Sequence, residues 1–166
     1  MQPRIDEFKT CVFTHRLVAS NETISELGKN GKDTAVLWHE AISGRRGKDI
    51  ASAFHAYIGS LRDTEKLTMW LDNCLGKNKN WSLFTMMLFI INCPRYEVKE
   101  IKLKYFEPGH TFMASDATHG RIEKQLRKMG KVFDFRDFVD ATKQAKCEPV
   151  EMAFTGFNDW ESDVSQ

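Results

Sequence analysis

The sequence predicts a mixed α/β fold, with helices covering a partly parallel sheet. Segments rich in β-branched and apolar residues alternate along the chain with segments whose apolar residues recur at helical spacing. Strands that alternate with helices are joined by right-handed crossovers, which make neighbouring strands parallel. The 166 residues, 42% of them hydrophobic, suffice for one core. We therefore expect a single domain over residues 1–154 and an acidic, unstructured tail over residues 155–166.

The first expected elements are two strands and a helix. Residues 8–24 alternate loosely between apolar and polar side chains, and residues 35–42 form a shorter run of the same kind. Between them, Gly28-Lys29-Asn30-Gly31 is typical of a turn. Residues 47–61 place their apolar side chains at helical spacing, which predicts an amphipathic helix.

The second half of the chain continues the alternation. Residues 66–71 read as a strand, and residues 81–92 read as a helix with Asn80 as its N-cap. The remaining expected elements are a strand at 98–106, helices at 117–132 and 135–146, and a short strand at 150–154.

Composition narrows the range of partners only slightly. The net charge of +1 provides no global attraction to nucleic acid or to a membrane, so such a partner would need a local patch. The apolar run from Leu83 to Ile91 is shorter than the roughly 20 residues of a membrane span. We expect no membrane partner. Four cysteines without a C-x-x-C pair favour a reducing, intracellular compartment, nuclear or cytoplasmic.

Two acidic residues stand where a sheet of this kind places ligands. Asp72 ends the strand at 66–71, and Asp116 follows the strand at 98–106, close to where the next helix should begin. Ligands gather at the carboxyl ends of strands in open α/β sheets. Each residue also has a structural interpretation, because Asp72 could stabilise a turn and Asp116 could cap a helix.

Three motifs then indicate a family. They are W-H-E-A-I-S-G-R-R-G-K-D-I-A-S at 38–52, D-N-C-L-G-K-N-K-N at 72–80 and E-P-G-H-T-F-M-A-S-D-A-T-H-G-R-I-E at 107–123. From about Pro3 to Met152 the chain resembles uncharacterised, transposon-associated RNase H-like domains of the transposase or integrase type. Their hallmark is D-N-C-x-G-Q-N-K-N followed by G-H-[ST] and a further Asp.

The resemblance implies an RNase H-like mixed sheet flanked by helices, and metal-dependent phosphodiester cleavage or strand transfer on nucleic acid, with DNA expected. Asp72 and Asp116 would be catalytic, and would help to hold two Mg²⁺ or Mn²⁺ ions about 3.5–4 Å apart. Related domains carry their first acid on a strand upstream of the residues that match M-Q-P-R-I. We therefore expect the opening strand and the first ligand to be missing, catalysis to be weak or absent, and the unpaired sheet edge to promote self-association.

Further candidates surround these acids. Glu40, at the end of W-H-E, and Glu123, in the helix after Asp116, could complete a metal site, but each could equally be a solvated or ion-paired carboxylate. His119 is a weaker candidate, because two histidines without a third ligand define no zinc site. The residues expected to bind phosphate or nucleic acid are Asn73, Lys77, Asn78, Lys79, His110, Arg121, Lys124 and Lys128.

Two functions therefore remain open at this point. One is a degenerate metal-dependent nuclease or transposase-like domain, incomplete in this chain. The other is a non-catalytic nucleic-acid or protein-interaction module, derived from a domesticated or fragmentary transposable element. Metal-dependent cleavage that is lost in Asp72→Asn would separate them. The basic residues have a structural alternative too, since a basic helix face is commonly plain solvated surface.

Overall fold

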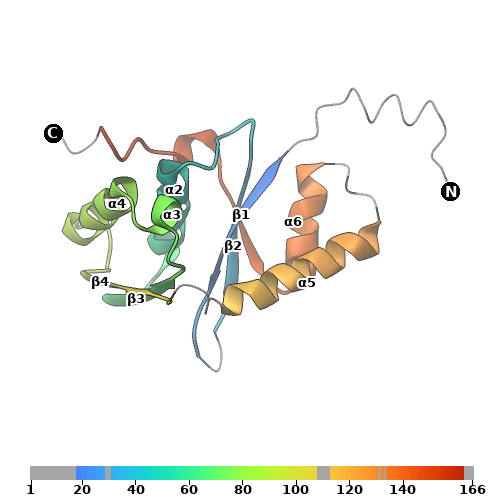
Figure 1. Ribbon diagram of the computed structural model, residues 1–166, viewed down its shortest axis with the longest axis horizontal. Coiled ribbons are helices and arrows are strands. Elements are labelled where there is room, and N and C mark those ends of the chain that lie inside the picture. Colours follow the sequence, from blue (N-terminus) through green and yellow to red (C-terminus); the bar gives the residue numbers. More distant parts are fainter. Residues whose placement is uncertain (1–17, 29–30, 108–112, 131, 133, 163–166) are drawn as a thin grey trace.

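The structure is a computed structural model that describes residues 18–28, 31–107, 113–130, 132 and 134–162. These residues form a mixed α/β fold with helices packed around two small sheets (Figure 1). The strands are β1 (Ala19–Ser25), β2 (Asp33–His39), β3 (Lys66–Leu71), β4 (Glu100–Tyr105) and β5 (Glu148–Glu151). The helices are α2 (Gly47–Ser60), α3 (Leu75–Asn78), α4 (Trp81–Asn92), α5 (Ala114–Met129) and α6 (Phe135–Gln144), followed by the 3₁₀ turn η1 (Phe154–Gly156).

The described strands form two sheets where the sequence predicted one. The larger sheet has the order β1-β2-β5, with β1 antiparallel and β5 parallel to β2. The smaller sheet is the parallel pair β3-β4. The expectation of a partly parallel arrangement is therefore confirmed, but the two sheets are not joined by hydrogen bonds between described strands.

Strand β2 separates two hydrophobic clusters, because successive side chains of a strand point to opposite faces. Val36 and Trp38 point into the larger cluster, which α2, α4 and β3 complete. Ala35 and Leu37 point the other way and pack with Val139 of α6. In Figure 1, α5 and α6 accordingly lie on the side of the three-stranded sheet away from α4 and the β3-β4 pair.

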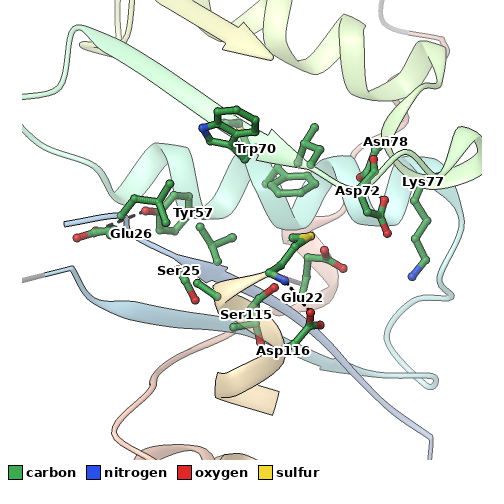
Figure 2. Close-up of a pocket in the computed structure, with 18 of the residues that line it drawn as sticks. Glu22, Ser25, Glu26, Tyr57, Trp70, Asp72, Lys77, Asn78, Ser115 and Asp116 are labelled. Carbon is green, nitrogen blue, oxygen red and sulfur yellow. Dashed lines mark hydrogen bonds between the residues drawn. The ribbon is translucent and has the colours of Figure 1, made fainter. Parts of the chain in front are cut away.

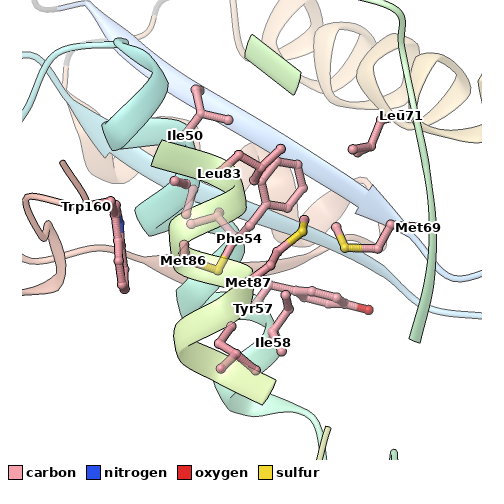
Figure 3. Packing of buried hydrophobic residues seen from close by; sticks show 14 of the residues in the cluster. Ile50, Phe54, Tyr57, Ile58, Met69, Leu71, Leu83, Met86, Met87 and Trp160 are labelled. Atoms are coloured by element: carbon pink, nitrogen blue, oxygen red, sulfur yellow. The ribbon is translucent and has the colours of Figure 1, made fainter. Parts of the chain in front are cut away.

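The larger cluster is built mainly between α2 and α4 (Figure 3). Ile50 and Leu83 are fully buried there, and Met69 and Leu71 join them from β3. Helix α4 is apolar on all sides but is buried on one only, since Leu88 on its outer face is 54% exposed. In the part of the chain that the structure describes, no helix is both long and apolar enough to cross a membrane.

The segment after residue 155 differs from the unstructured tail that we expected. Trp160 is only 3% exposed and belongs to the larger cluster. Its indole Nε1 donates a hydrogen bond of 2.9 Å to Ser52 Oγ on α2. Phe154, Phe157 and Trp160 recur every three residues in this segment, and Phe157 packs against the same cluster, so an apolar signal was present beside the acidic residues.

Most elements lie close to where the sequence placed them, but several boundaries moved. Strand β1 covers 19–25 where 8–24 was expected, with residues 8–17 outside the described part of the chain, and β2 covers 33–39 where 35–42 was expected. The short helix α3 was not predicted. The strand at 66–71 and the helix at 81–92 match, and Asn80 caps α4 as predicted by accepting a 2.9 Å hydrogen bond from the Leu83 N–H. Helix α5 begins at Ala114, three residues before the predicted start at Ala117. Strand β5 covers 148–151, not 150–154, because it pairs in register with β2.

Candidate functional site

A cleft of about 550 Å³ lies between strand β1 and strand β3. Residues 21–27 line it from β1, and residues 67–72 line it from β3. Phe54 and Tyr57 of α2 and the first residues of α5 complete its walls. Figure 2 shows Asp72 and Lys77 on one side, and Glu22 and Asp116 on the other. The structure thus brings together the two acids, Asp72 and Asp116, that the sequence singled out.

Asp72 leaves the end of β3 and enters a turn. Its Oδ1 accepts a 3.2 Å hydrogen bond from the Cys74 N–H and another from the side-chain amide of Asn78. Asn78 is buried, and its carbonyl oxygen accepts a 2.9 Å hydrogen bond from the Tyr105 hydroxyl of β4. Asp72 therefore has the structural turn role that was its alternative interpretation, and it also lines the cleft.

The rest of the loop after Asp72 is held by Asn80. Besides capping α4, the Asn80 amide donates to the carbonyl oxygens of Lys77 at 2.8 Å and Gly76 at 3.2 Å. A Cβ on Gly47 would lie 2.9 Å from the Asn80 nitrogen, so a larger residue there would displace the Asn80 side chain from its hydrogen bonds. The first and second sequence motifs meet at this contact. It fixes the loop so that Lys77, half-buried, lines the cleft.

Asp116 lies in the first turn of α5, on the opposite wall. Its Oδ2 accepts a 2.8 Å hydrogen bond from the Met113 N–H, which stabilises the start of the helix. The predicted capping role is thus fulfilled, although from inside the helix and not from the residue before it. The Asp116 side chain is exposed and lines the same cleft as Asp72.

Glu22 is a cleft residue that sequence reasoning missed. It lies on β1 with the same alternation as Ile24, which packs against the larger cluster, so its carboxyl group faces inward. Burial raises the pKa of Glu22; Lys77 and Arg45 oppose this shift, and the nearby Asp72 carboxylate adds to it. Its position two residues before Ile24 was the available signal, because side chains two residues apart in a strand share a face.

Several predicted site residues lie away from the cleft. The carboxylate of Glu40 is exposed and accepts a 3.1 Å hydrogen bond from the Val18 N–H. Glu123 forms a surface ion pair of 3.2 Å with Arg127. Asn73 and Lys79 are not among the described residues that line the cleft, and Lys79 Nζ lies 4.6 Å from the centre of the Tyr105 ring. His110 lies outside the described residues.

The basic residues of α5 divide into two groups. Arg121 bridges structural elements: its guanidinium donates to the Asp33 carboxylate and, at 3.2 Å, to the Ala145 carbonyl oxygen. Burial alone would raise the pKa of Asp33, but hydrogen bonds including the one from Arg121 lower it below its ordinary value. Lys124 and Lys128 are exposed on the outer surface of the helix. Arg121, which was expected to bind nucleic acid, is thus engaged within the protein, whereas Lys124 and Lys128 lie on the exposed surface.

His119 has a positioning contact inside the cleft. Its Nε2 lies 2.9 Å from Thr23 Oγ1, so the pair forms a hydrogen bond between α5 and β1. This contact links the start of α5 to the strand that carries Glu22. The histidine therefore supports one wall of the cleft.

The described residues do not complete a metal site. Over the described ranges, no group of three or more His, Cys, Asp and Glu side chains is arranged to hold a metal ion. Asp72 and Asp116 each commit one carboxylate oxygen to a neighbouring N–H group. A two-metal site needs more carboxylates than these two residues supply, so no step of a metal-dependent reaction follows from the described side chains.

The fold and the cleft define a mixed α/β protein with four carboxylates, those of Glu22, Glu26, Asp72 and Asp116, along a gap between two strands. The family model described as Domain of unknown function (DUF7869) matches residues 54–162, so the chain belongs to this family. The matched region includes Asp72 and Asp116 but not Glu22. No curated protein and no solved structure matches the chain.

Proposed function

We propose that this chain is an RNase H-like domain of the transposase type, descended from an enzyme that cleaves or transfers nucleic-acid strands with Mg²⁺ or Mn²⁺. The observation that carries the proposal is the convergence of Asp72 and Asp116 on one cleft. These residues come from two separate motifs and two different elements, β3 and α5. Their placement agrees with the roles that the family resemblance assigned to them.

The order of elements supports the same proposal. Two antiparallel strands are followed by a helix, and then β3 and β4 run parallel with α4 between them. This is the order expected for an RNase H-like fold that lacks its opening strand. Asp72 follows the first strand of the parallel pair, and Asp116 begins the helix that follows the second.

The residues in the cleft have distinct roles under this proposal. Asp72 and Asp116 would hold a divalent ion through the carboxylate oxygens that they do not use in the turn and the helix start. Lys77 would contact a phosphate of the nucleic acid, preferably DNA. Because Glu22, Asp72 and Asp116 form no group arranged to hold a metal ion over the described residues, we expect the chain to bind metal weakly and to leave phosphodiester bonds intact.

Binding of Mn²⁺ tests the two acids without relying on activity. Paramagnetic Mn²⁺ added to the full chain should broaden the NMR signals of residues around Asp72 and Asp116 first. The broadening should be lost in Asp72→Asn and retained in Glu40→Gln, which changes an exposed carboxylate outside the cleft. Broadening centred elsewhere, or none at all, would contradict the proposal.

A cleavage assay tests the second half of the proposal. The full chain is incubated with single- and double-stranded DNA and Mn²⁺, and the DNA is analysed on a denaturing gel. We expect at most weak cleavage, and any that occurs should disappear in both Asp72→Asn and Asp116→Asn. Cleavage that survives both substitutions would assign the activity to other residues.

The second candidate function is a non-catalytic nucleic-acid or protein-interaction module. It is favoured by the engagement of Asp72 and Asp116 in a turn and a helix start, and by the incomplete acid group over the described residues. Binding to DNA without cleavage supports it. Replacing Lys124 and Lys128 by alanine should then weaken DNA binding and reduce its salt dependence, whereas Lys143→Ala on α6 should not.

A further inference from the structure

The cleft is bounded by two strand edges that have no strand partner within the described residues. Strand β1 pairs with β2 on one side, and β3 pairs with β4 on one side. Their other edges both border the cleft. An unpaired edge presents a row of backbone N–H and C=O groups that can pair with another strand.

The hydrogen bonds of β1 show which of its residues face the cleft. Glu40 N–H bonds to Val18 C=O at 3.0 Å, and Glu26 N–H bonds to Lys32 C=O at 2.9 Å. In an antiparallel pair, backbone groups alternate between the two edges of a strand. The even-numbered residues of β1 therefore bond to β2. The residues whose N–H and C=O point away from β2, toward the free edge, are Asn21, Thr23 and Ser25.

The same reasoning applies to β3. Phe106 N–H bonds to Leu71 C=O at 3.1 Å, and Glu100 N–H bonds to Glu65 C=O at 3.1 Å. The odd-numbered residues of β3 thus bond to β4, and Thr68 and Trp70 direct their backbone groups toward the cleft. Two facing edges therefore each present alternate donors and acceptors to the same space.

The side chains around this space suit a strand with alternating character. Phe54 and Tyr57 of α2 and Met69 of β3 form an apolar wall of the cleft. On the other side, the first residues of α5, including the exposed Asp116, are more polar. A strand inserted between the edges would direct alternate side chains to these two environments.

We propose that the cleft between β1 and β3 binds one extended segment of another polypeptide, which adds a strand to both edges at once and joins the two sheets. Strand addition of this kind derives affinity from main-chain hydrogen bonds and specificity from alternate side chains. The expected segment has apolar residues at every second position. The proposal rests on backbone geometry, so it stands or falls independently of the proposed nuclease ancestry.

The strands that the structure describes in a second copy do not fit the cleft equally well. Each of these strands has at least one edge already paired, so none of them could satisfy both edges of the cleft. The occupant needs a single strand with two free edges. A segment from a different polypeptide, not built into a sheet, meets that requirement.

Amide hydrogen exchange of the full chain tests the proposal. The probe is a synthetic peptide of about eight residues, alternating valine and threonine, with lysine at each end for solubility. Binding should slow the exchange of the N–H groups of Asn21, Thr23, Ser25, Thr68 and Trp70 by about tenfold or more. The N–H groups of Glu22 and Ile24, which already face β2, should change little.

A matched pair of variants at Thr68 isolates the backbone contribution. Thr68→Pro removes an N–H that faces the cleft, and Thr68→Val keeps it at the same exposed position. We expect the proline variant to bind the peptide about tenfold more weakly and the valine variant to bind it as the wild type does. A peptide that is N-methylated at alternate residues lacks the N–H groups needed to pair with a strand edge. It tests the same contribution without changing the protein, and it should not protect the amides of the cleft.

Three outcomes would overturn the proposal. The peptide could fail to protect the five amides at concentrations up to about 1 mM. The amides could already be protected in the free monomer, which would assign the cleft to another segment of this chain. Protection could also rise with protein concentration alone, together with a larger mass in sedimentation, which would assign it to a second copy.

Discussion

The two walls of the cleft are held in place in different ways. The β3 wall, which consists of β3, the loop 72–80 and α4, belongs to the larger hydrophobic cluster through Leu71 and Leu83. The β1 wall consists of β1 and α5. Helix α5 buries one large apolar side chain, Ile122, among its described residues, and it meets the sheet mainly through polar contacts such as His119 with Thr23.

Because the two walls differ in packing, the carboxylates of the cleft are not held in position equally firmly. Asp72 sits on a packed core, and Asn78 fixes its side chain. Asp116 is positioned by one bond within its own helix end, and Glu22 by the strand at a free edge. Any ligand of the cleft would thus meet one preformed wall and one adaptable wall.

The largest expected effect comes from breaking the β3 wall. Leu83→Ala removes a fully buried side chain from the larger cluster, and it should lower the free energy of unfolding by about 3–4 kcal/mol. Leu88→Ala makes the same chemical change on the exposed face of α4 and should cost less than about 0.5 kcal/mol. Urea denaturation of both variants measures the difference. Equal effects would show that α4 does not anchor this wall.

A smaller effect is expected when the β1 wall is disturbed. Ile122→Ala should lower the free energy of unfolding by about 2 kcal/mol, because Ile122 is buried but lies outside both hydrophobic clusters. Hydrogen exchange should accelerate in α5 and stay unchanged in α4. Lys124→Ala, on the exposed face, is the control. Faster exchange in both helices would mean that the walls unfold as one unit.

The cap of α4 provides a more local test of the loop. Asn80→Ala should cost about 1 kcal/mol in the free energy of unfolding, since it removes the cap and two bonds to the loop. The NMR signals of residues 72–78 should shift at the same time. Asn92→Ala, at the other end of the helix, should leave those signals in place. An unchanged loop in Asn80→Ala would argue against a preformed Asp72.

The smallest effect on stability is expected at Glu22. Its substitution removes a single charge, and Lys77 and Arg45 already offset part of the cost of burying that charge. Since its pKa is raised in the folded protein, the wild type loses stability as the pH rises from below the ordinary glutamate pKa through the folded pKa. Glu22→Gln should remove this loss, so its stability relative to the wild type should increase from pH 4 to pH 7. Thermal unfolding of the variant and the wild type across this pH range measures the difference in stability. A difference in stability that stays constant from pH 4 to pH 7 would refute the shift.

Much of the fold could be predicted from local patterns. Helical spacing of apolar residues located α2, a continuous apolar run with the Asn80 N-cap located α4, and an apolar segment ending at Asp72 located β3. These signals are strong where an element buries one continuous face. They were weak at Ala114–Asp116, where the first helical turn is polar, and at Trp160, which docks together with Phe157 outside any regular helix or strand.

The residues of the candidate site also fall into those that local sequence patterns could predict and those that they could not. Asp72 and Asp116 could be selected because strand ends and helix starts are readable in the sequence, whereas Glu40 and Glu123 were chosen without knowledge of which side of an element faces the cleft. Arg121 was expected to bind nucleic acid, but it pairs with Asp33 on a strand far away in the sequence. Distant pairings of this kind leave no local pattern.

The sequence by itself determined the elements, their order and the two acids at element ends, because hydrophobic periodicity and capping are properties of neighbouring residues. Only the tertiary structure decided that the strands form two sheets, that a cleft separates β1 from β3 and that Glu22 joins Asp72 and Asp116 along it. Pairing between strands depends on which edges meet after packing, and that is set by contacts between residues far apart in the chain.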